Sequence, residues 1–101
     1  MIYEIRHYTL FDGKFEDMMA RFKEVNLPLF RKYGITVDQT WSHPDDRTKF
    51  SFLMSFTDEH SRKKSWQQYH EDETFLAGRE TQKSIIEHIE WHVLNPVHIA
   101  D

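Results

Sequence analysis

The chain has 101 residues, enough for one domain, because two domains of half this length would each be too short to bury a stable core. Its 13 basic and 17 acidic side chains give a net charge of −4, which argues against a nucleic-acid partner. With no cysteine, the chain has no disulfide, thiolate metal site or cysteine nucleophile. No apolar run reaches membrane-spanning length and no signal segment precedes the first strand, so we expect one cytoplasmic domain over 1–101 without membrane insertion.

The second to tenth residues, IYEIRHYTL, alternate as a β-strand does. Glu4, Arg6 and Tyr8 then share one face of the strand, and Ile5 and His7 lie on the other. We expect the face with Glu4 and Arg6 to be left uncovered by helices. Ile5 and His7 are expected to point toward the helices.

Apolar residues recur mostly at steps of three or four from Phe15 to Phe30, which predicts an amphipathic helix ending before Gly34. Pro28 interrupts this pattern. Its ring removes a backbone donor and clashes with the carbonyl four residues earlier, so we expect a kink or a break near Asn26–Leu27.

Two alternating stretches, GITVDQTWS and TKFSFLMSF, are joined by the polar turn HPDDR and predict a hairpin. In the first of them we expect Ile35, Val37, Gln39 and Trp41 to share a face.

A helix capped by Thr57 is expected to run to about Tyr69, and a further helical piece from about Asp72 to Lys83. The stretch SIIEHIEWHVL then predicts a last strand, which Pro96 ends or places at an edge.

The order strand, helix, strand, strand, helix, strand is that of a ferredoxin-like α+β fold, β-α-β-β-α-β, with an antiparallel four-stranded sheet covered by helices on one face. The other face meets solvent or packs on a second copy, closing two sheets into a shared barrel. Because aromatic residues make up 15% of a small chain, its core gains much from such pairing, and we expect a homodimer.

The stretch YEIRHYTLFDGKFEDMMARFKEVNLPLFRKYGI resembles the opening of NIPSNAP-type domains. The matching residues are Glu4, Arg6, Tyr8, Leu10, Gly13, Lys14, Leu27, Pro28 and Gly34. Ile5 replaces a leucine of the family motif, and the resemblance continues through Trp41 and more weakly through EDETF. It implies a dimeric α/β barrel and no particular reaction. Related barrels include cofactor-free monooxygenases, haem-degrading enzymes and sugar mutarotases, an analogy of fold alone.

Glu4 and Arg6 lie two residues apart on one strand face. Arg6 can orient an anionic or carbonyl-bearing ligand, or the two can form an ion pair inside a subunit interface. His7 is either a general acid or base with aromatic walls or a core histidine with one hydrogen bond. Arg6 and His7 are therefore the candidate catalytic residues.

Large aromatic side chains can line a pocket for a flat ring, or they can fill a small core. The candidate ligand-binding residues of this kind are Tyr3, Tyr8, Tyr33, Trp41 and Trp66. Four further histidines fall in predicted turns, helix ends or the tail and are expected to be solvated: His43, His60, His70 and His98.

His88, Glu90 and His92 share a strand face, and two imidazoles with a carboxylate can bind a transition metal. Side chains that project in parallel from a strand do not converge without a bend or bulge. We therefore predict no metal at this position, and no cofactor.

These observations predict a protein that binds a small aromatic or carbonyl-containing molecule in a pocket between sheet and helices. One alternative is a cofactor-free monooxygenase or isomerase in which His7 transfers the proton and Arg6 stabilises an oxyanion. The other is a purely structural module whose polar strand faces serve assembly. Whether the chain is an enzyme stays open.

Overall fold

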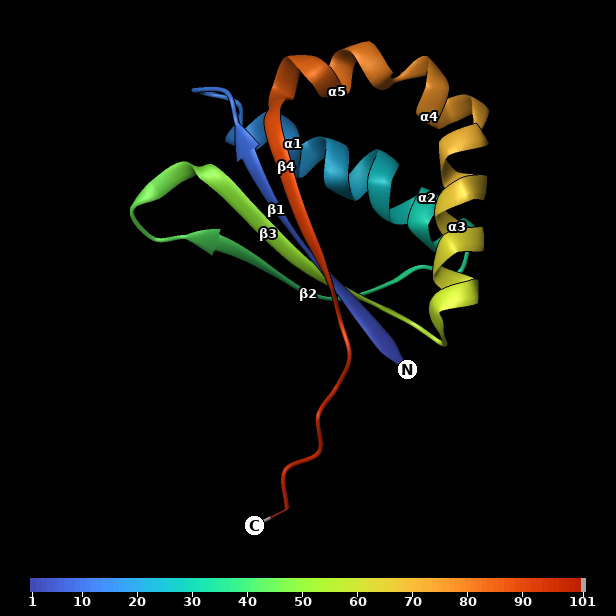
Figure 1. The fold of residues 1–101 in the computed structure, drawn as a ribbon. Helices are drawn as coiled ribbons and strands as arrows, with labels where there is room; N and C mark the ends of the chain where they lie inside the picture. The colour runs from blue at the N-terminus through green and yellow to red at the C-terminus, as the bar shows by residue number, and fades with distance from the viewer. Residues whose placement is uncertain (101) are drawn as a thin grey trace.

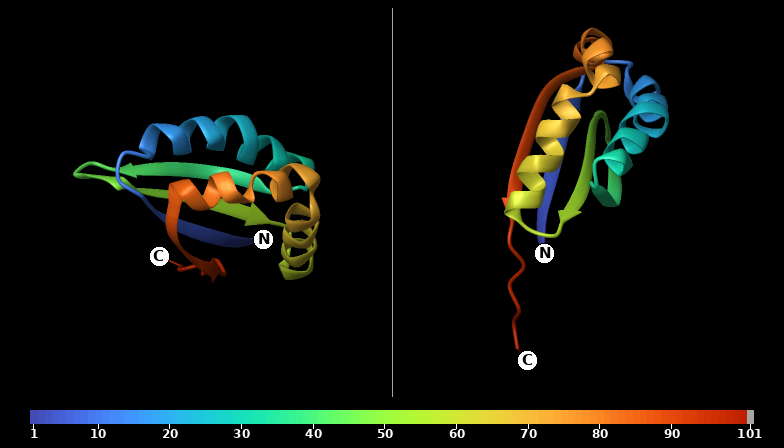
Figure 2. Two further views of the ribbon diagram at one scale, coloured as in Figure 1. Left: turned by 90° about the horizontal axis from the view of Figure 1, so that it is seen from above. Right: turned by 90° about the vertical axis from the view of Figure 1, so that its right-hand side faces the viewer.

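The computed structural model describes residues 1–100 (Figure 1). Its elements in chain order are β1 (Ile2–Leu10), α1 (Phe15–Arg21), η1 (Phe22–Asn26), α2 (Leu27–Lys32), β2 (Thr36–His43), β3 (Asp46–Phe56), α3 (Glu59–Glu71), α4 (Glu73–Ala77), α5 (Arg79–Ile85) and β4 (Ile86–Leu94). After β4 the chain runs away from the body of the molecule (Figures 1 and 2).

The strands form one four-stranded sheet in the order β2-β3-β1-β4, with every neighbouring pair antiparallel. Both helical segments pack on the same face of this sheet. Phe30 of α2 lies 6.1 Å from Phe52 of β3 and 5.8 Å from Trp66 of α3, measured between ring centroids. The predicted ferredoxin-like topology with one covered face is therefore confirmed.

The covered face of β1 is the opposite of the one we predicted. Glu4 is fully buried on the helix side, and Tyr8 packs edge-on against Phe52 with 5.1 Å between ring centroids. Ile5 and His7 lie on the uncovered face, where they pair with β3 residues of that face.

The register explains this reversal. Phe50, Phe52 and Met54 of β3 lie opposite Tyr8, Arg6 and Glu4, and this apolar row has to face the helices. Glu4 and Arg6 lie on the same face of the sheet as this apolar row, so they lie beneath the helices. The burial of Glu4 is tolerated because the two side chains are hydrogen-bonded to each other.

A bulge in β2 corrects a second prediction. The register with β3 shifts between Val37 and Gln39, so Val37 pairs with the core residue Met54. Gln39 and Trp41 pair with Leu53 and Ser51 and lie on the uncovered face. One extra residue reverses the side of every residue that follows, so Val37 and Trp41 do not share a face.

Pro28 distorts its helix without breaking it. Residues Phe22–Asn26 form a π-helical turn, and α2 continues from Leu27, so α1, η1 and α2 make one continuous segment (Figure 2). The carbonyl that the proline ring would meet belongs to Glu24, inside this widened turn. The expected disturbance thus lies slightly earlier in the chain than predicted.

The second helical segment has three parts. Asp58, and not the predicted Thr57, caps α3 by accepting a hydrogen bond from the backbone N–H of Ser61. Asp72 caps α4, and Gly78 separates α4 from α5. No helix among residues 1–100 is long and apolar enough to cross a membrane.

Candidate functional site

A fully buried carboxylate is the centre of the candidate site. Glu4 accepts hydrogen bonds from Arg6 Nε at 2.6 Å, from Arg62 Nη1 at 2.8 Å and from Trp66 Nε1 at 2.9 Å. Arg6 comes from the same strand, and the other two donors come from α3. Hydrogen bonds to a charged acceptor are strong in a buried environment, so these contacts fix α3 against β1.

Two tryptophans flank the arginines of this group. The guanidinium carbon of Arg6 lies 4.1 Å from the ring centroid of Trp66 and 5.7 Å from that of Trp91 on β4. The guanidinium of Arg62 lies 5.6 Å from the Trp91 ring. We call Glu4, Arg6, Arg62, Trp66 and Trp91 the Arg6 cluster. A cation held over an aromatic face is stabilised electrostatically, so both guanidinium groups are held in place.

The two arginines differ in what their nitrogens bind. Arg62 uses Nη1 on Glu4 and its other nitrogens on Glu59. Arg6 has its Nε fixed by Glu4 and its guanidinium beside the hydroxyl of Tyr8, but within residues 1–100 its terminal nitrogens donate to no carboxylate or carbonyl group. Arg6 therefore presents a planar pair of donors, the arrangement that binds a carboxylate or carbonyl oxygen well.

The Arg6 cluster opens to solvent along β4. Trp91 lies opposite Arg6 in the register, yet its side chain is 49% exposed, and Val93 is 36% exposed. Figure 1 shows the reason: α4 and α5 lead from the end of α3 to the start of β4, and the helices leave the rest of that edge strand uncovered. A ligand bound here would bury apolar surface of Trp91.

His70 belongs to the same region. Arg62, Trp66 and His70 are spaced four residues apart on α3, so they share one face of the helix. The His70 ring stacks on Trp66 with 5.6 Å between centroids and an interplanar angle of 21°, and it lies 5.2 Å from Phe75. Burial, and then the charge of Arg6, lower the pKa of His70, while Glu4 acts in the opposite direction.

The part that His70 and Arg62 take in this region was not predicted from the sequence. His70 was expected to be solvated and is an exposed residue, but the stacking of its ring on Trp66 was not foreseen. Arg62 was not among the candidate residues. The signal that could have found them is the four-residue spacing of Arg62, Trp66 and His70, which follows directly once α3 is predicted.

The predicted ligand-binding aromatics do not form one site. Trp66 lies in the Arg6 cluster, and Tyr8 lies in the core beside Arg6, where burial raises the pKa of its hydroxyl and Arg6 opposes this. Tyr3 and Trp41 lie on the uncovered face of the sheet. Tyr33 caps the end of α2 and donates its hydroxyl proton to the carboxylate that caps α4.

The two predicted catalytic residues lie on opposite faces of the sheet. His7 is on the uncovered face, where its Nδ1 lies 2.8 Å from Ser51 Oγ. It borders a shallow hollow of about 290 Å³ whose lining includes Thr9, His43, Lys49, His88 and Glu90. Arg6 lies on the helix side, so His7 and Arg6 do not meet in one site of this chain.

The three residues on β4 that were considered as metal ligands, His88, Glu90 and His92, are exposed. His92 Nε2 lies 3.3 Å from Glu90 Oε2, while His88 pairs with Thr9 further along the strand. Among residues 1–100, no three His, Asp or Glu side chains gather in a geometry that holds a metal ion. The absence of a bound metal stays a prediction for measurement.

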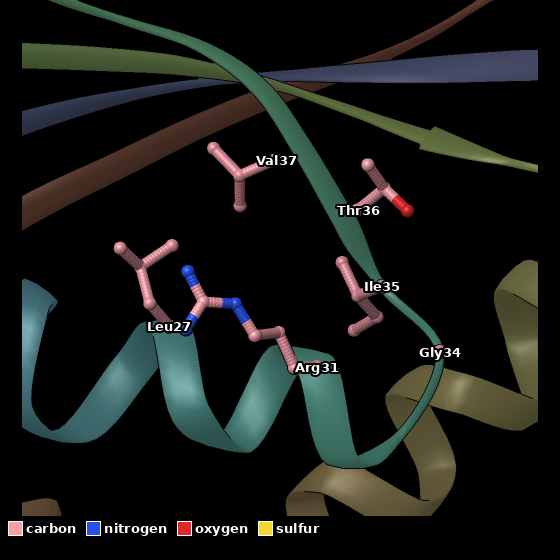
Figure 3. A pocket seen from close by; sticks show the side chains of 6 residues that line it. All are labelled: Leu27, Arg31, Gly34, Ile35, Thr36 and Val37. Carbon is pink, nitrogen blue, oxygen red and sulfur yellow. The ribbon is translucent and has the colours of Figure 1, made fainter.

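A further pocket lies between α2 and the start of β2 (Figure 3). It has a volume of about 270 Å³ and is lined by Leu27, Arg31, Gly34, Ile35, Thr36 and Val37. Arg31 contributes the only charged group among these six, and its side chain extends toward Leu27. The pocket holds no group of polar side chains that could act together, so the Arg6 cluster is the stronger candidate.

Solved structures share this fold along the whole chain, whereas no curated protein sequence matches it. An uncharacterised NIPSNAP domain protein from Burkholderia xenovorans has a TM-score of 0.87 at 19% identity, covering 100% of this chain and 99% of its own. A NIPSNAP family protein from Agrobacterium tumefaciens has a TM-score of 0.85 at 16% identity, covering 95% and 92%. An antibiotic biosynthesis monooxygenase has a TM-score of 0.73 at 12% identity, covering 97% and 100%. At these identities the similarities establish the fold alone.

The sequence itself identifies the family. The NIPSNAP family model matches residues 3–101, which include the motif residues of β1, the Leu27–Pro28 step and Gly34. The resemblance read from those residues is thereby confirmed, and the chain belongs to the NIPSNAP family.

Proposed function

We propose that the chain binds a small, planar molecule, aromatic or carbonyl-containing, at the Arg6 cluster between the sheet and α3. One observation carries this proposal. Arg6 is fixed by Glu4 and flanked by Trp66 and Trp91, while its terminal nitrogens face no carboxylate or carbonyl group within residues 1–100.

The arrangement reduces the entropic cost of binding. The guanidinium of Arg6 is already held in one orientation, so little side-chain freedom is lost when it takes a ligand oxygen. The half-exposed ring of Trp91 offers a flat apolar surface beside it. A planar ligand gains both a charge-assisted hydrogen bond and aromatic contact at the same place.

Homodimerisation through the uncovered face of the sheet is part of the proposal. That face carries apolar residues from all four strands, namely Tyr3, Ile5, Trp41, Leu53 and Leu94. Trp41 is 43% exposed and Leu94 is also 43% exposed. Apolar side chains gathered on one bare sheet face favour contact with another protein surface, and a second copy offers a matching one.

The alternatives from the sequence are kept apart from this proposal. A monooxygenase or isomerase that uses His7 and Arg6 together needs a site that both reach, and they lie on opposite faces. A role of His7 in catalysis stays a prediction, located in the hollow of the uncovered face. A purely structural module would bind no ligand. The expected cytoplasmic location is a separate proposal, which cell fractionation would test.

Binding is tested with benzoate and acetophenone, a carboxylate and a ketone that each carry one aromatic ring. Calorimetry should show that the parent chain binds at least one of them. The binding affinity should be lower in Arg6→Lys and about tenfold lower in Trp91→Ala. The matched controls Arg31→Lys and Phe11→Ala change exposed residues outside the cluster and should bind as the parent does. If neither compound binds, or if all variants bind equally, the proposal is wrong.

A further inference from the structure

His70 is an ionisable residue beside the Arg6 cluster, and the ligand binding proposed above does not use it. Its ring stacks on Trp66, and within residues 1–100 neither ring nitrogen makes a hydrogen bond. Arg6 contacts the same indole, at 4.1 Å from the ring centroid. The His70 imidazole and the guanidinium of Arg6, which also lies beside the Tyr8 hydroxyl, therefore contact the same indole ring.

We propose that the Arg6 cluster catalyses proton transfer on an enolisable aromatic carbonyl compound, with Arg6 holding the carbonyl oxygen and His70 carrying the proton. This inference rests on the proposed function, because it requires the ligand to bind at Arg6. It adds a reaction type, a substrate class and a catalytic residue that sequence reasoning had assigned to the solvated surface.

The reaction is balanced without a further reactant. The C–H bond next to the carbonyl group breaks, and its proton moves to a ring nitrogen of His70. The electron pair forms a C=C bond as the carbonyl oxygen becomes an enolate oxygen, which the N–H groups of Arg6 stabilise. The imidazolium then returns the proton to that oxygen or to another carbon, giving an enol or an isomer.

The surroundings of His70 suit a base. Trp66 and Tyr69 approach the ring from α3, Phe75 approaches from α4, and the charged groups facing it are Arg6 and Glu4 of β1. Burial and Arg6 lower the pKa of His70 below its ordinary 6.5, so the imidazole is neutral at pH 7 and can accept a proton.

Glu4 and Arg6 also provide the binding position for the carbonyl oxygen of the substrate. Glu4 holds Arg6 through Nε and leaves the terminal nitrogens to the substrate, so Glu4 is a positioning residue. Since Glu4 is fully buried and binds Arg62 and Trp66 as well, its orientation does not depend on the substrate. Donors fixed in advance are the ones that stabilise a developing charge most effectively.

Phenylpyruvate is a suitable probe, because it joins an aromatic ring to a carbonyl group with an acidic methylene. Quenching of tryptophan fluorescence measures its binding. Proton NMR in deuterated buffer measures exchange of its methylene protons, and ultraviolet absorbance follows its enol. The parent chain should bind phenylpyruvate and accelerate exchange, and His70→Asn should bind it while losing about 100-fold or more of that acceleration.

A histidine on the same helix provides the matched control. His60 is exposed near the start of α3, so His60→Asn should exchange protons as fast as the parent does. If phenylpyruvate binds but the parent and His70→Asn exchange equally, the proton-transfer role is wrong and ligand binding stands. If phenylpyruvate, benzoate and acetophenone all fail to bind, both the proton-transfer role and the proposed ligand binding are wrong. His70 is an exposed residue, so His70→Asn should fold. A circular dichroism spectrum equal to that of the parent would show that it does.

Discussion

The Nε of Arg6 lies 2.6 Å from Oε2 of Glu4, a carboxylate with no exposed surface. This pair lies inside the chain, between β1 and α3, on the face of the sheet that the helices cover. Arg62 and Trp66 complete the coordination of Glu4, so the carboxylate keeps two donors if Arg6 is removed.

The two members of the pair should therefore differ in their effect on stability. Glu4→Gln leaves two guanidinium groups without their shared carboxylate and should lower the free energy of unfolding by about 3–5 kcal/mol. Arg6→Met removes one donor of three and should cost about 1–3 kcal/mol. Urea denaturation of each variant measures both values.

An exposed ion pair serves as the control. Arg47 and Glu16 are both more than half exposed, so Arg47→Met should change the free energy of unfolding by about 1 kcal/mol or less. A Glu4→Gln protein as stable as the parent, or one less affected than Arg6→Met, would contradict the assigned role of the buried carboxylate.

The fold followed from periodicity because each element carries its own pattern. The bounds of β1 match the predicted strand, and the hairpin of β2 and β3 and the final strand were also expected. Periodicity did not predict which face of each strand packs against the helices. Alternation says which residues share a face, but the choice of core side depends on Phe50, Phe52 and Met54 across the sheet, and a bulge after Val37 moved Trp41 to the other side.

The candidate site was predictable only in part. Glu4 and Arg6 were identified as a pair, and Trp66 as a wall. Arg62 and His70 needed the helical register of α3, and Trp91 needed its pairing with Arg6 across the sheet. His7 was expected on the helix side and lies on the uncovered face, so it is not part of this site.

Asp72 should make the chain sensitive to acid. The hydroxyl of Tyr33 and then the ammonium of Lys32 hold the pKa of this carboxyl well below its ordinary value of 3.8, as do two backbone N–H groups of α4. The folded state therefore binds fewer protons than the unfolded state as the pH falls toward this range. The stabilisation is present above about pH 4 and is lost progressively below it.

Replacing Asp72 tests this coupling. Asp72→Asn should lower the melting temperature at pH 7 and should reduce the further loss seen between pH 5 and pH 2.5. Asp45→Asn, in the exposed hairpin turn, should leave both measurements close to those of the parent. An Asp72→Asn protein with the parent's melting temperature at pH 7 would rule out this account.

The purified chain should carry no stoichiometric transition metal. His88, Glu90 and His92 project from one exposed strand, and the contact among them is the 3.3 Å approach of His92 to Glu90. Side chains at alternate positions of a strand stay parallel, so they do not converge on one ion. Elemental analysis after dialysis should find far less than one zinc, iron, nickel or copper per chain, and a value near one would refute the prediction.

The uncovered face of the sheet should hold two copies together. Trp41 is 43% exposed on that face, opposite Ser51 of β3, and a carboxylate placed there in both copies would be desolvated without a partner. Trp41→Asp should therefore shift the chain from dimer to monomer in sedimentation equilibrium, with its circular dichroism unchanged. Phe11→Asp is the matched control, because Phe11 is 42% exposed but lies beyond β1. A monomeric parent chain, or a Trp41→Asp dimer as tight as the parent, would show that this face does not join two copies.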